Sequence, residues 1–149
     1  MALKPLYLID KSAWEQRRYD DRARTRIGEL RDSDQLALCV ITMTELLYSA
    51  RSAPEMEQDH EFLSELAFLT MTPAAEQLVV TTMKALARRG QHRGRPIPEL
   101  LLAAVAQAHG AVVLHYDHDY ELIADATGQP HEWIIPRGSG HGKGAGRSQ

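Results

Sequence analysis

Short runs of mostly apolar residues recur along the chain and are separated by longer segments of mixed polarity. The clearest runs cover residues 6–9, 36–41, 111–115 and 133–135. A continuous apolar run of this length is typical of a strand that is buried on both faces. Such strands, alternating with helices, predict an α/β fold in which helices cover both sides of a central parallel sheet.

Helix signals fill the segments between the predicted strands. Ser12 and Thr42 each begin a capping-box pattern, with a glutamate three residues later. Pro73 follows a capping threonine, and Gly110 is placed to end a helix that is apolar nearly all round. These signals predict helices over residues 12–30, 42–52, 55–69, 73–89, 98–109 and 120–126.

The composition is that of a single globular domain. The chain has 149 residues, of which 44% are hydrophobic and 25% charged. Cys39 is its single cysteine, so no disulfide can form within the chain and a reducing compartment is expected. No apolar run approaches the roughly 18 residues that cross a bilayer. We therefore expect a cytoplasmic protein without a membrane segment.

The C-terminal end has a different composition from the rest of the chain. From residue 138 onward, glycine alternates with small or basic residues, which cannot pack into a core. The sequence therefore predicts a folded domain over residues 1–137 and a flexible glycine-rich tail over residues 138–149.

Acidic residues come soon after three of the predicted strands, and one more lies at the start of a predicted helix. Asp10 comes directly after the first strand, Glu45 in the first turn of the helix after the second, and Asp117 and Asp119 after a later strand. Glu99 lies in the first turn of another helix. Because ligands bind at the carboxyl ends of parallel strands, these acids are expected to meet at one edge of the sheet.

Several carboxylates at one place repel each other unless a cation balances them. Oxygen ligands favour Mg²⁺ or Mn²⁺, and one or two such ions can activate water for attack on a phosphodiester. Each acid taken alone is equally well explained as a helix cap or as a partner of a helix N-terminus. Acids that follow three separate strands are difficult to explain by capping, so the pattern favours a metal site.

Four motifs occur together over residues 6–136. They are Leu-Ile-Asp-Lys-Ser at 8–12, Ile-Thr-Met-Thr-Glu-Leu-Leu at 41–47, Pro-Glu-Leu-Leu-Leu-Ala-Ala at 98–104 and Val-Leu-His-Tyr-Asp-His-Asp-Tyr at 113–120. In this order they resemble the PIN-domain ribonucleases, and among these the VapC toxins of bacterial VapBC toxin–antitoxin pairs. The resemblance implies a PIN-like three-layer fold and an endoribonuclease that needs Mg²⁺ or Mn²⁺. It also implies a homodimer and inhibition by a cognate VapB-type antitoxin.

The resemblance also assigns roles to individual residues. The catalytic, metal-binding acids that it implies are Asp10, Glu45, Glu99 and Asp117, with Asp119 as a further metal ligand and Ser12 as an accessory residue that supports Asp10 or the substrate. The family pattern has aspartate where this chain has Glu99. Glutamate carries its charge about 1.5 Å further from the backbone, so we expect this chain to be a slow or silent nuclease.

Arginines form two clusters in a chain whose net charge is −3. Their members are Arg17, Arg18, Arg22, Arg24 and Arg26 in the first cluster, and Arg88, Arg89, Arg93 and Arg95 in the second. Either cluster is explained by a solvated surface, but two clusters raise the odds of a polyanionic ligand. Arg93 and Arg95, in the loop before Glu99, are the candidates for contacts with RNA phosphates.

Two other functions compete with a metal-dependent nuclease. The sequence Asp117-His118-Asp119 resembles the Asp-x-Asp motif of haloacid-dehalogenase-type phosphatases, but it lies near the end of the domain and not on the first strand. The second alternative is a PIN-like domain that binds RNA or a protein without cutting. His115 and His118 flank Asp117, and we expect satisfied or solvent-facing side chains there, since metal-bound water needs no imidazole as base.

Overall fold

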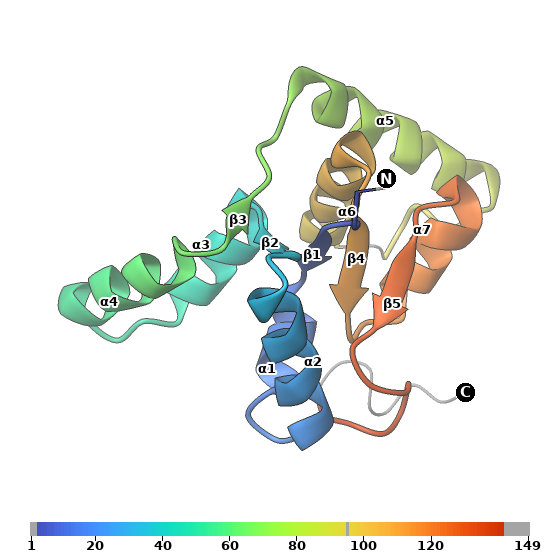
Figure 1. The fold of residues 1–149 in the computed structure, drawn as a ribbon. Coiled ribbons are helices and arrows are strands. Elements are labelled where there is room, and N and C mark those ends of the chain that lie inside the picture. The colour runs from blue at the N-terminus through green and yellow to red at the C-terminus, as the bar shows by residue number, and fades with distance from the viewer. Residues whose placement is uncertain (1–2, 95, 142–149) are drawn as a thin grey trace.

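Five short parallel strands form the central sheet of the computed structural model, which describes residues 3–94 and 96–141 (Figure 1). In the described residues the strands are β1 (Tyr7–Ile9), β2 (Leu36–Leu38), β3 (Ala67–Phe68), β4 (Val112–His115) and β5 (His131–Trp133). Their order across the sheet is β3-β2-β1-β4-β5, and every neighbouring pair is parallel.

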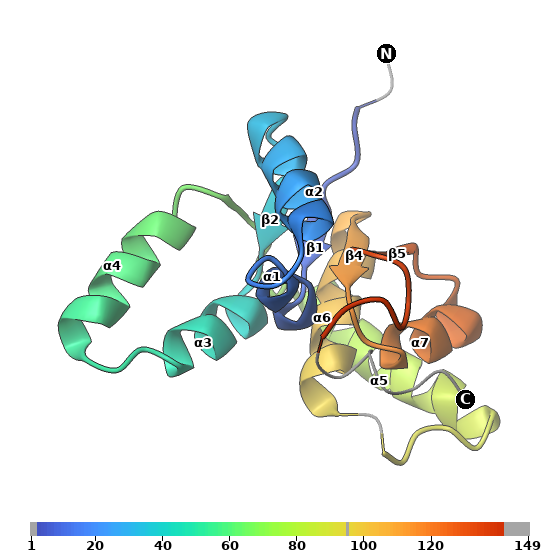
Figure 2. The same ribbon diagram turned by 90° about the horizontal axis from the view of Figure 1, so that it is seen from below.

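Helices connect these strands. Within the described ranges they are α1 (Lys11–Gln16), α2 (Asp21–Asp32), α3 (Val40–Tyr48), α4 (Ala53–Leu63), α5 (Pro73–Arg88), α6 (Ile97–His109) and α7 (Asp119–Thr127). Figures 1 and 2 show α3 and α4 extending away from the β3 side of the sheet as an arm. None of the helices in the described part of the chain is long and apolar enough to cross a membrane.

Both faces of the sheet are covered, because successive strand residues point to opposite sides. Leu8 and Val113 pack into a core with α5, α6 and α7. Ile9 and Leu114, each one residue further on, pack into a second core with α1 and α2. This arrangement confirms the predicted three-layer α/β fold.

The strand order places a crevice at the carboxyl end of β1. The chain moves from β1 to β2 on one side and later returns to β4 on the other side of β1. In open parallel sheets, ligands bind where the strand order reverses in this way. β1 and β4 end level with each other, since Ile9 pairs with Leu114 and Asp10 donates its N–H to the Leu114 carbonyl (2.9 Å).

The predicted helix over residues 12–30 is two helices in the structure. Asp20 separates them by capping α2, where its side chain accepts the Arg22 N–H at 2.8 Å. Ser12 is also not the N-cap of the first helix, because Asp10 takes that position and accepts the Ser12 N–H. A local aspartate cap therefore overrode the longer helical pattern.

The predicted strand over residues 36–41 ends at Leu38, and Val40 and Ile41 already belong to α3. A short apolar run cannot by itself distinguish a buried strand from a buried helix. The helix thus begins before the predicted capping box, so Glu45 lies in its second turn and not its first. Thr42 lies inside the helix, where its hydroxyl donates to the Ile9 carbonyl at 2.7 Å.

Other boundaries differ by a few residues or are confirmed. The helix predicted over 55–69 ends at Leu63, and β3 was missed because its two residues are exposed at the sheet edge. The last strand lies at 131–133, two residues before its predicted position. Thr72 caps α5 by accepting the Ala75 N–H at 3.1 Å, and Gly110 ends α6 with a positive φ of 66°, both as predicted.

The first residues of the predicted glycine-rich tail still contact the domain. Gly140 donates its N–H to the Tyr116 hydroxyl at 2.7 Å, and His141 donates its N–H to the Gln16 side chain at 2.8 Å. Residues 142–149 lie outside the described residues, so the division into domain and flexible tail stays a prediction.

Candidate functional site

A cleft of about 440 Å³ opens at the carboxyl ends of β1 and β4. All four acids predicted to be catalytic line it, namely Asp10, Glu45, Glu99 and Asp117. Two of them follow strands, and the other two lie on α3 and α6. The fold therefore brings together carboxylates from four separate segments, while their roles stay predictions.

The Asp10 carboxylate is almost buried and is held from both sides. Its Oδ2 accepts the Ser12 N–H (2.9 Å) and the Ser12 hydroxyl (2.5 Å), and its Oδ1 accepts the Tyr120 hydroxyl (2.8 Å). Burial raises the pKa of Asp10 above its usual value, while the hydrogen bonds from Ser12 and Tyr120 act in the opposite direction. The carboxylate is thus fixed in one orientation before any ligand arrives.

Ser12 connects the ends of the two central strands. Its hydroxyl donates to Asp10 and accepts the Tyr116 N–H at 2.9 Å. Tyr116 directly follows β4, so one side chain sets the spacing between the segments that carry Asp10 and Asp117. The structure places Ser12 in contact with Asp10, and its accessory role stays a prediction.

Three further carboxylates form a group beside Asp10. One oxygen each from Glu99, Asp117 and Asp119 lies within 4.8 Å of the other two. Asp117 and Asp119 are each 1% exposed, and Asp117 Oδ1 accepts the Asp119 N–H at 3.0 Å. Buried oxygen ligands at this spacing suit a hard divalent cation such as Mg²⁺.

His115 contacts the backbone of Asp117 and is unsuited to act as a base. Its Nδ1 accepts the Asp117 N–H at 3.1 Å, so the ring proton lies on Nε2, 2.8 Å from Nδ1 of His131. Burial, and then the neighbouring His131, lower the pKa of His115 to about 3. His118 Nδ1 lies 3.1 Å from the Glu121 carboxylate. Both histidines have partners, as the sequence predicted.

The sequence matches the PIN domain family over residues 7–126. The chain belongs to the PIN-domain family. Among its relatives, Ribonuclease VapC51 of Mycobacterium tuberculosis is 40% identical over 139 residues, which cover 93% of this chain and 98% of the relative. Ribonuclease VapC18 of the same organism is 34% identical over 136 residues, covering 90% and 98%.

Solved structures share the fold of this PIN domain at low identity. DNA-bound VapBC from Salmonella typhimurium superposes with a TM-score of 0.69 at 20% identity, covering 89% of this chain and 100% of that one. VapBC-1 from nontypeable Haemophilus influenzae gives a TM-score of 0.70 at 18% identity, covering 87% and 98%. At these identities the comparison shows the fold alone.

Tyr120 is a site residue of this PIN domain that the sequence analysis missed. Its hydroxyl is buried and donates to Asp10, 110 positions away in the chain. Burial, followed by the charges of Asp10 and Glu99, raises the pKa of Tyr120 well above its usual value, so the hydroxyl stays a donor. Tyr120 belongs to the motif at 113–120, but nothing local indicates that it contacts Asp10.

The predicted RNA-binding arginines are only partly described. Arg93 lies in a turn between α5 and α6 and is exposed, and it is not among the described residues that line the cleft. Arg95 lies outside the described residues. Contacts of these side chains with RNA therefore stay a prediction.

Proposed function

We propose that this PIN domain is a metal-dependent endoribonuclease and the toxin of a toxin–antitoxin pair. The observation that carries the proposal is the group of Glu99, Asp117 and Asp119, two of which line an open cleft together with Asp10. Relatives that match nearly the whole chain bear the name Ribonuclease VapC. The test is whether the purified chain cleaves a mixed pool of RNA in the presence of Mg²⁺.

The side chains of the site fit one or two Mg²⁺ or Mn²⁺ ions. The donor set consists of carboxylate oxygens within 4.8 Å of one another, without a thiolate among them. Two of the three acids are nearly fully buried, where negative charges cost free energy unless a cation offsets them. When bound, such a cation supplies Lewis-acid stabilisation and lowers the pKa of bound water.

The residues of this chain position the reacting groups. Ser12 and Tyr120 hold Asp10 in one orientation, and the Asp119 N–H holds Asp117. In a site that is preorganised in this way, less free energy is needed to reorient polar groups when charge develops in the transition state. Glu45, on α3, adds a carboxylate from another wall of the cleft.

The proposed partners follow from the same relatives. Several of the solved structures that share the fold are VapBC complexes, which supports a VapB-type antitoxin as partner of this chain. RNA is the proposed substrate, the cytoplasm the proposed location, and a homodimer the proposed assembly. The alternative is a PIN domain that binds RNA or protein without cutting, and Glu99 in place of aspartate is the observation that favours it.

Glu99→Asp is expected to raise the rate of RNA cleavage and to tighten Mg²⁺ binding. The helix that carries Glu99 is packed into the core through Leu100, Leu102 and Ala103. Because the core is tightly packed, α6 cannot easily shift away from the cleft to make room for a longer side chain. Catalytic groups tolerate only about 0.5 Å of displacement. The measurement is cleavage rate against Mg²⁺ concentration for both proteins. An aspartate variant that is no faster at any concentration would make Glu99 a fully competent native ligand.

Replacing both Arg93 and Arg95 with alanine is expected to flatten the salt dependence of RNA binding. Each lost phosphate contact reduces the slope of log K against log salt by about 0.7 for single strands. Fluorescence anisotropy over a series of salt concentrations measures this slope. The matched control is Arg51→Ala, an exposed arginine in the connection between α3 and α4. Equal slopes in all three proteins would exclude these arginines as phosphate ligands.

A further inference from the structure

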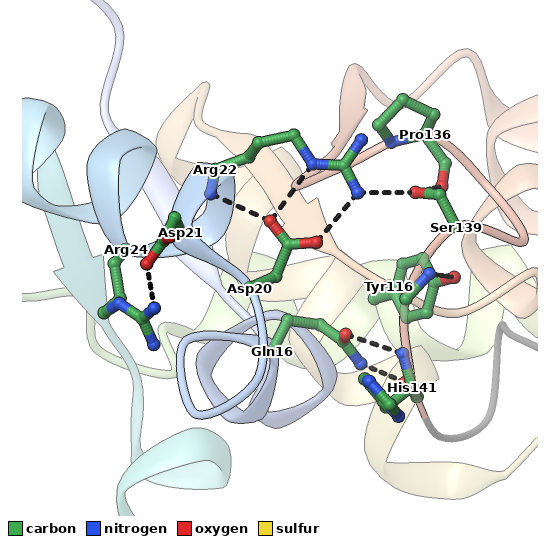
Figure 3. A network of polar contacts seen from close by, with 10 residues as sticks. Gln16, Asp20, Asp21, Arg22, Arg24, Tyr116, Pro136, Ser139 and His141 are labelled. Carbon is green, nitrogen blue, oxygen red and sulfur yellow. Dashed lines mark hydrogen bonds and ion pairs between the residues drawn. The ribbon is translucent and has the colours of Figure 1, made fainter.

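The chain returns to the cleft after its last strand. Residues 138–141 pass close to α1, and Figure 3 shows the main chain at His141 facing the amide of Gln16. This contact uses only the main chain of His141. Its N–H donates to Gln16 Oε1 (2.8 Å), and Gln16 Nε2 donates to its carbonyl oxygen. Gln16 is only 3% exposed, so its side of this pair of hydrogen bonds is buried.

Gly140 lets the segment approach this closely. Its N–H donates to the Tyr116 hydroxyl at 2.7 Å, which adds an anchor at the end of β4. A Cβ at position 140 would run into Gln16 Oε1 and would lie 2.6 Å from Cδ1 of Ile135. An alanine here would force the Gln16 and Ile135 side chains to shift, so close packing favours glycine in a stretch where the sequence indicated only a flexible tail.

Arg22 holds the segment at another point. Its guanidinium donates to both carboxylate oxygens of Asp20 (3.1 and 2.8 Å) and to the Ser139 hydroxyl at 3.2 Å (Figure 3). The hydrogen bonds from Arg22 lower the pKa of Asp20 to about 2, so the pair is charged at neutral pH. The segment is thus attached through Gln16, Tyr116 and Arg22.

These attachments bring two rings together at the cleft that holds the acids. The centroids of the Tyr19 and His141 rings are 4.6 Å apart and their planes meet at 44°, and both residues line the cleft with Asp10 and Asp117. Tyr19 is 59% exposed, so much of its ring faces solvent. An exposed tyrosine alone is ordinary, but this one is paired with a ring whose backbone segment is attached at three points.

We propose that Tyr19 and His141 form a stacking site for a base of single-stranded RNA next to the bond that is cut. The inference rests on the proposed nuclease function and names how its substrate is held. Unpaired bases stack on aromatic side chains, and such stacking is tolerant of sequence because every base has a π-face. The cleft is lined mostly by polar and acidic side chains, so stacking on the base adds attraction that does not depend on charge.

The first test compares Tyr19→Ala with Tyr48→Ala on a short fluorescent single-stranded RNA. Loss of one stacked base corresponds to about a 5- to 150-fold change in affinity. We expect Tyr19→Ala to raise KM by this factor with little change in kcat, and Tyr19→Trp to restore KM. Tyr48 is 88% exposed on α3, so Tyr48→Ala is a matched control that should leave KM unchanged. An unchanged KM in Tyr19→Ala would overturn the proposal.

The second test asks whether ring and base act on each other. Binding of RNA is measured by anisotropy, using the Asp10→Asn protein to prevent cleavage and oligonucleotides with one abasic position. Removing the contacted base should weaken binding to the Asp10→Asn protein but have no further effect once Tyr19→Ala is added, since the two changes remove the same contact. Additive losses at every abasic position would contradict a stacking site.

Gly140→Ala tests the role of the segment itself. The added Cβ should displace His141 and raise KM by at least 5-fold, and His141→Ala should raise KM by the same factor. The control is Gly28→Ala in α2, whose added Cβ meets nothing within 4 Å and which should not change KM. If Gly140→Ala instead lowers KM or speeds cleavage, the segment obstructs the cleft and the proposal fails.

The two proposals fail in different ways. A chain that cuts no RNA under any metal condition removes the proposed function, whereas the binding experiments still decide whether Tyr19 contacts a base. If the wild type and Tyr19→Ala both cut RNA with equal KM, the nuclease function stands and the stacking site is excluded.

Discussion

Removal of divalent cations is expected to abolish RNA cleavage by this PIN domain. The acids at the carboxyl ends of β1 and β4 provide oxygen ligands for a cation, and the buried His115, whose two ring nitrogens already have partners, is not available as a base. Excess EDTA should therefore reduce the rate to background, and added Mg²⁺ or Mn²⁺ should restore it. The measurement is the initial rate on a fluorescent RNA pool.

The control for this prediction is EDTA already saturated with Mg²⁺, which should have no effect on the rate. A second readout does not depend on activity. A cation that binds the folded chain raises its melting temperature with concentration, and Asp117→Asn should weaken that rise. Cleavage that continues undiminished in EDTA would exclude the metal-dependent mechanism, and a melting temperature that does not respond to Mg²⁺ would argue against the site itself.

Asp10→Asn is expected to reduce cleavage by more than about 100-fold. Changing a residue that only supports a metal ligand typically costs 10- to 100-fold, so loss of a proposed ligand should cost more. Asparagine keeps a side-chain oxygen that can accept the Ser12 N–H and cap α1, which separates chemistry from folding. The measurement is kcat/KM at saturating Mg²⁺.

Glu15→Gln is the matched control for Asp10→Asn. Glu15 also lines the cleft, but its carboxylate is 45% exposed and lies 3.7 Å from Lys11 Nζ, outside the predicted acid set. We expect less than a threefold change in its rate, since exposed ion pairs contribute little. Equal losses in the two variants would mean that net charge in the cleft matters and that Asp10 has no special role.

Asp10→Ala should lose activity like Asp10→Asn, and should in addition lower the free energy of unfolding. It removes the cap of α1, worth about 0.5–2 kcal/mol, and leaves the buried Tyr120 hydroxyl without its acceptor, at about 1–3 kcal/mol. Relief of repulsion with Asp117 offsets part of this cost. A thermal melt that shows Asp10→Ala below Asp10→Asn would support this account of the contacts.

The pattern of apolar and polar residues predicted the structure correctly where the conformation of a short segment depends mainly on its own residues. The apolar runs at β1 and β4 predict buried strands, and the acids directly after them reach the same edge because parallel strands end there. Thr72 and Gly110 act within a few residues of themselves, so their roles as cap and stop were readable from the sequence. The same reasoning led to Asp10 and Asp117 as residues of one site.

Tertiary structure decided whatever depends on segments that are distant in the chain. Residues 39–41 were assigned to a strand because apolar runs in strands and buried helices look alike, and only packing against the end of β1, including the hydrogen bond from Thr42 to Ile9, places the start of α3 there. β3 exists because β2 offers it a free edge, not because its two exposed residues favour a strand.

The sequence by itself determined the fold class and the acids of the candidate site, because hydrophobic periodicity and strand ends are local properties. The contacts that orient those acids were decided by the tertiary structure. Tyr120 reaches Asp10 across 110 positions, and Gln16 meets His141 across 125. A hydrogen bond between such distant residues leaves no local pattern, since each partner only needs to be polar and correctly placed once the chain has folded.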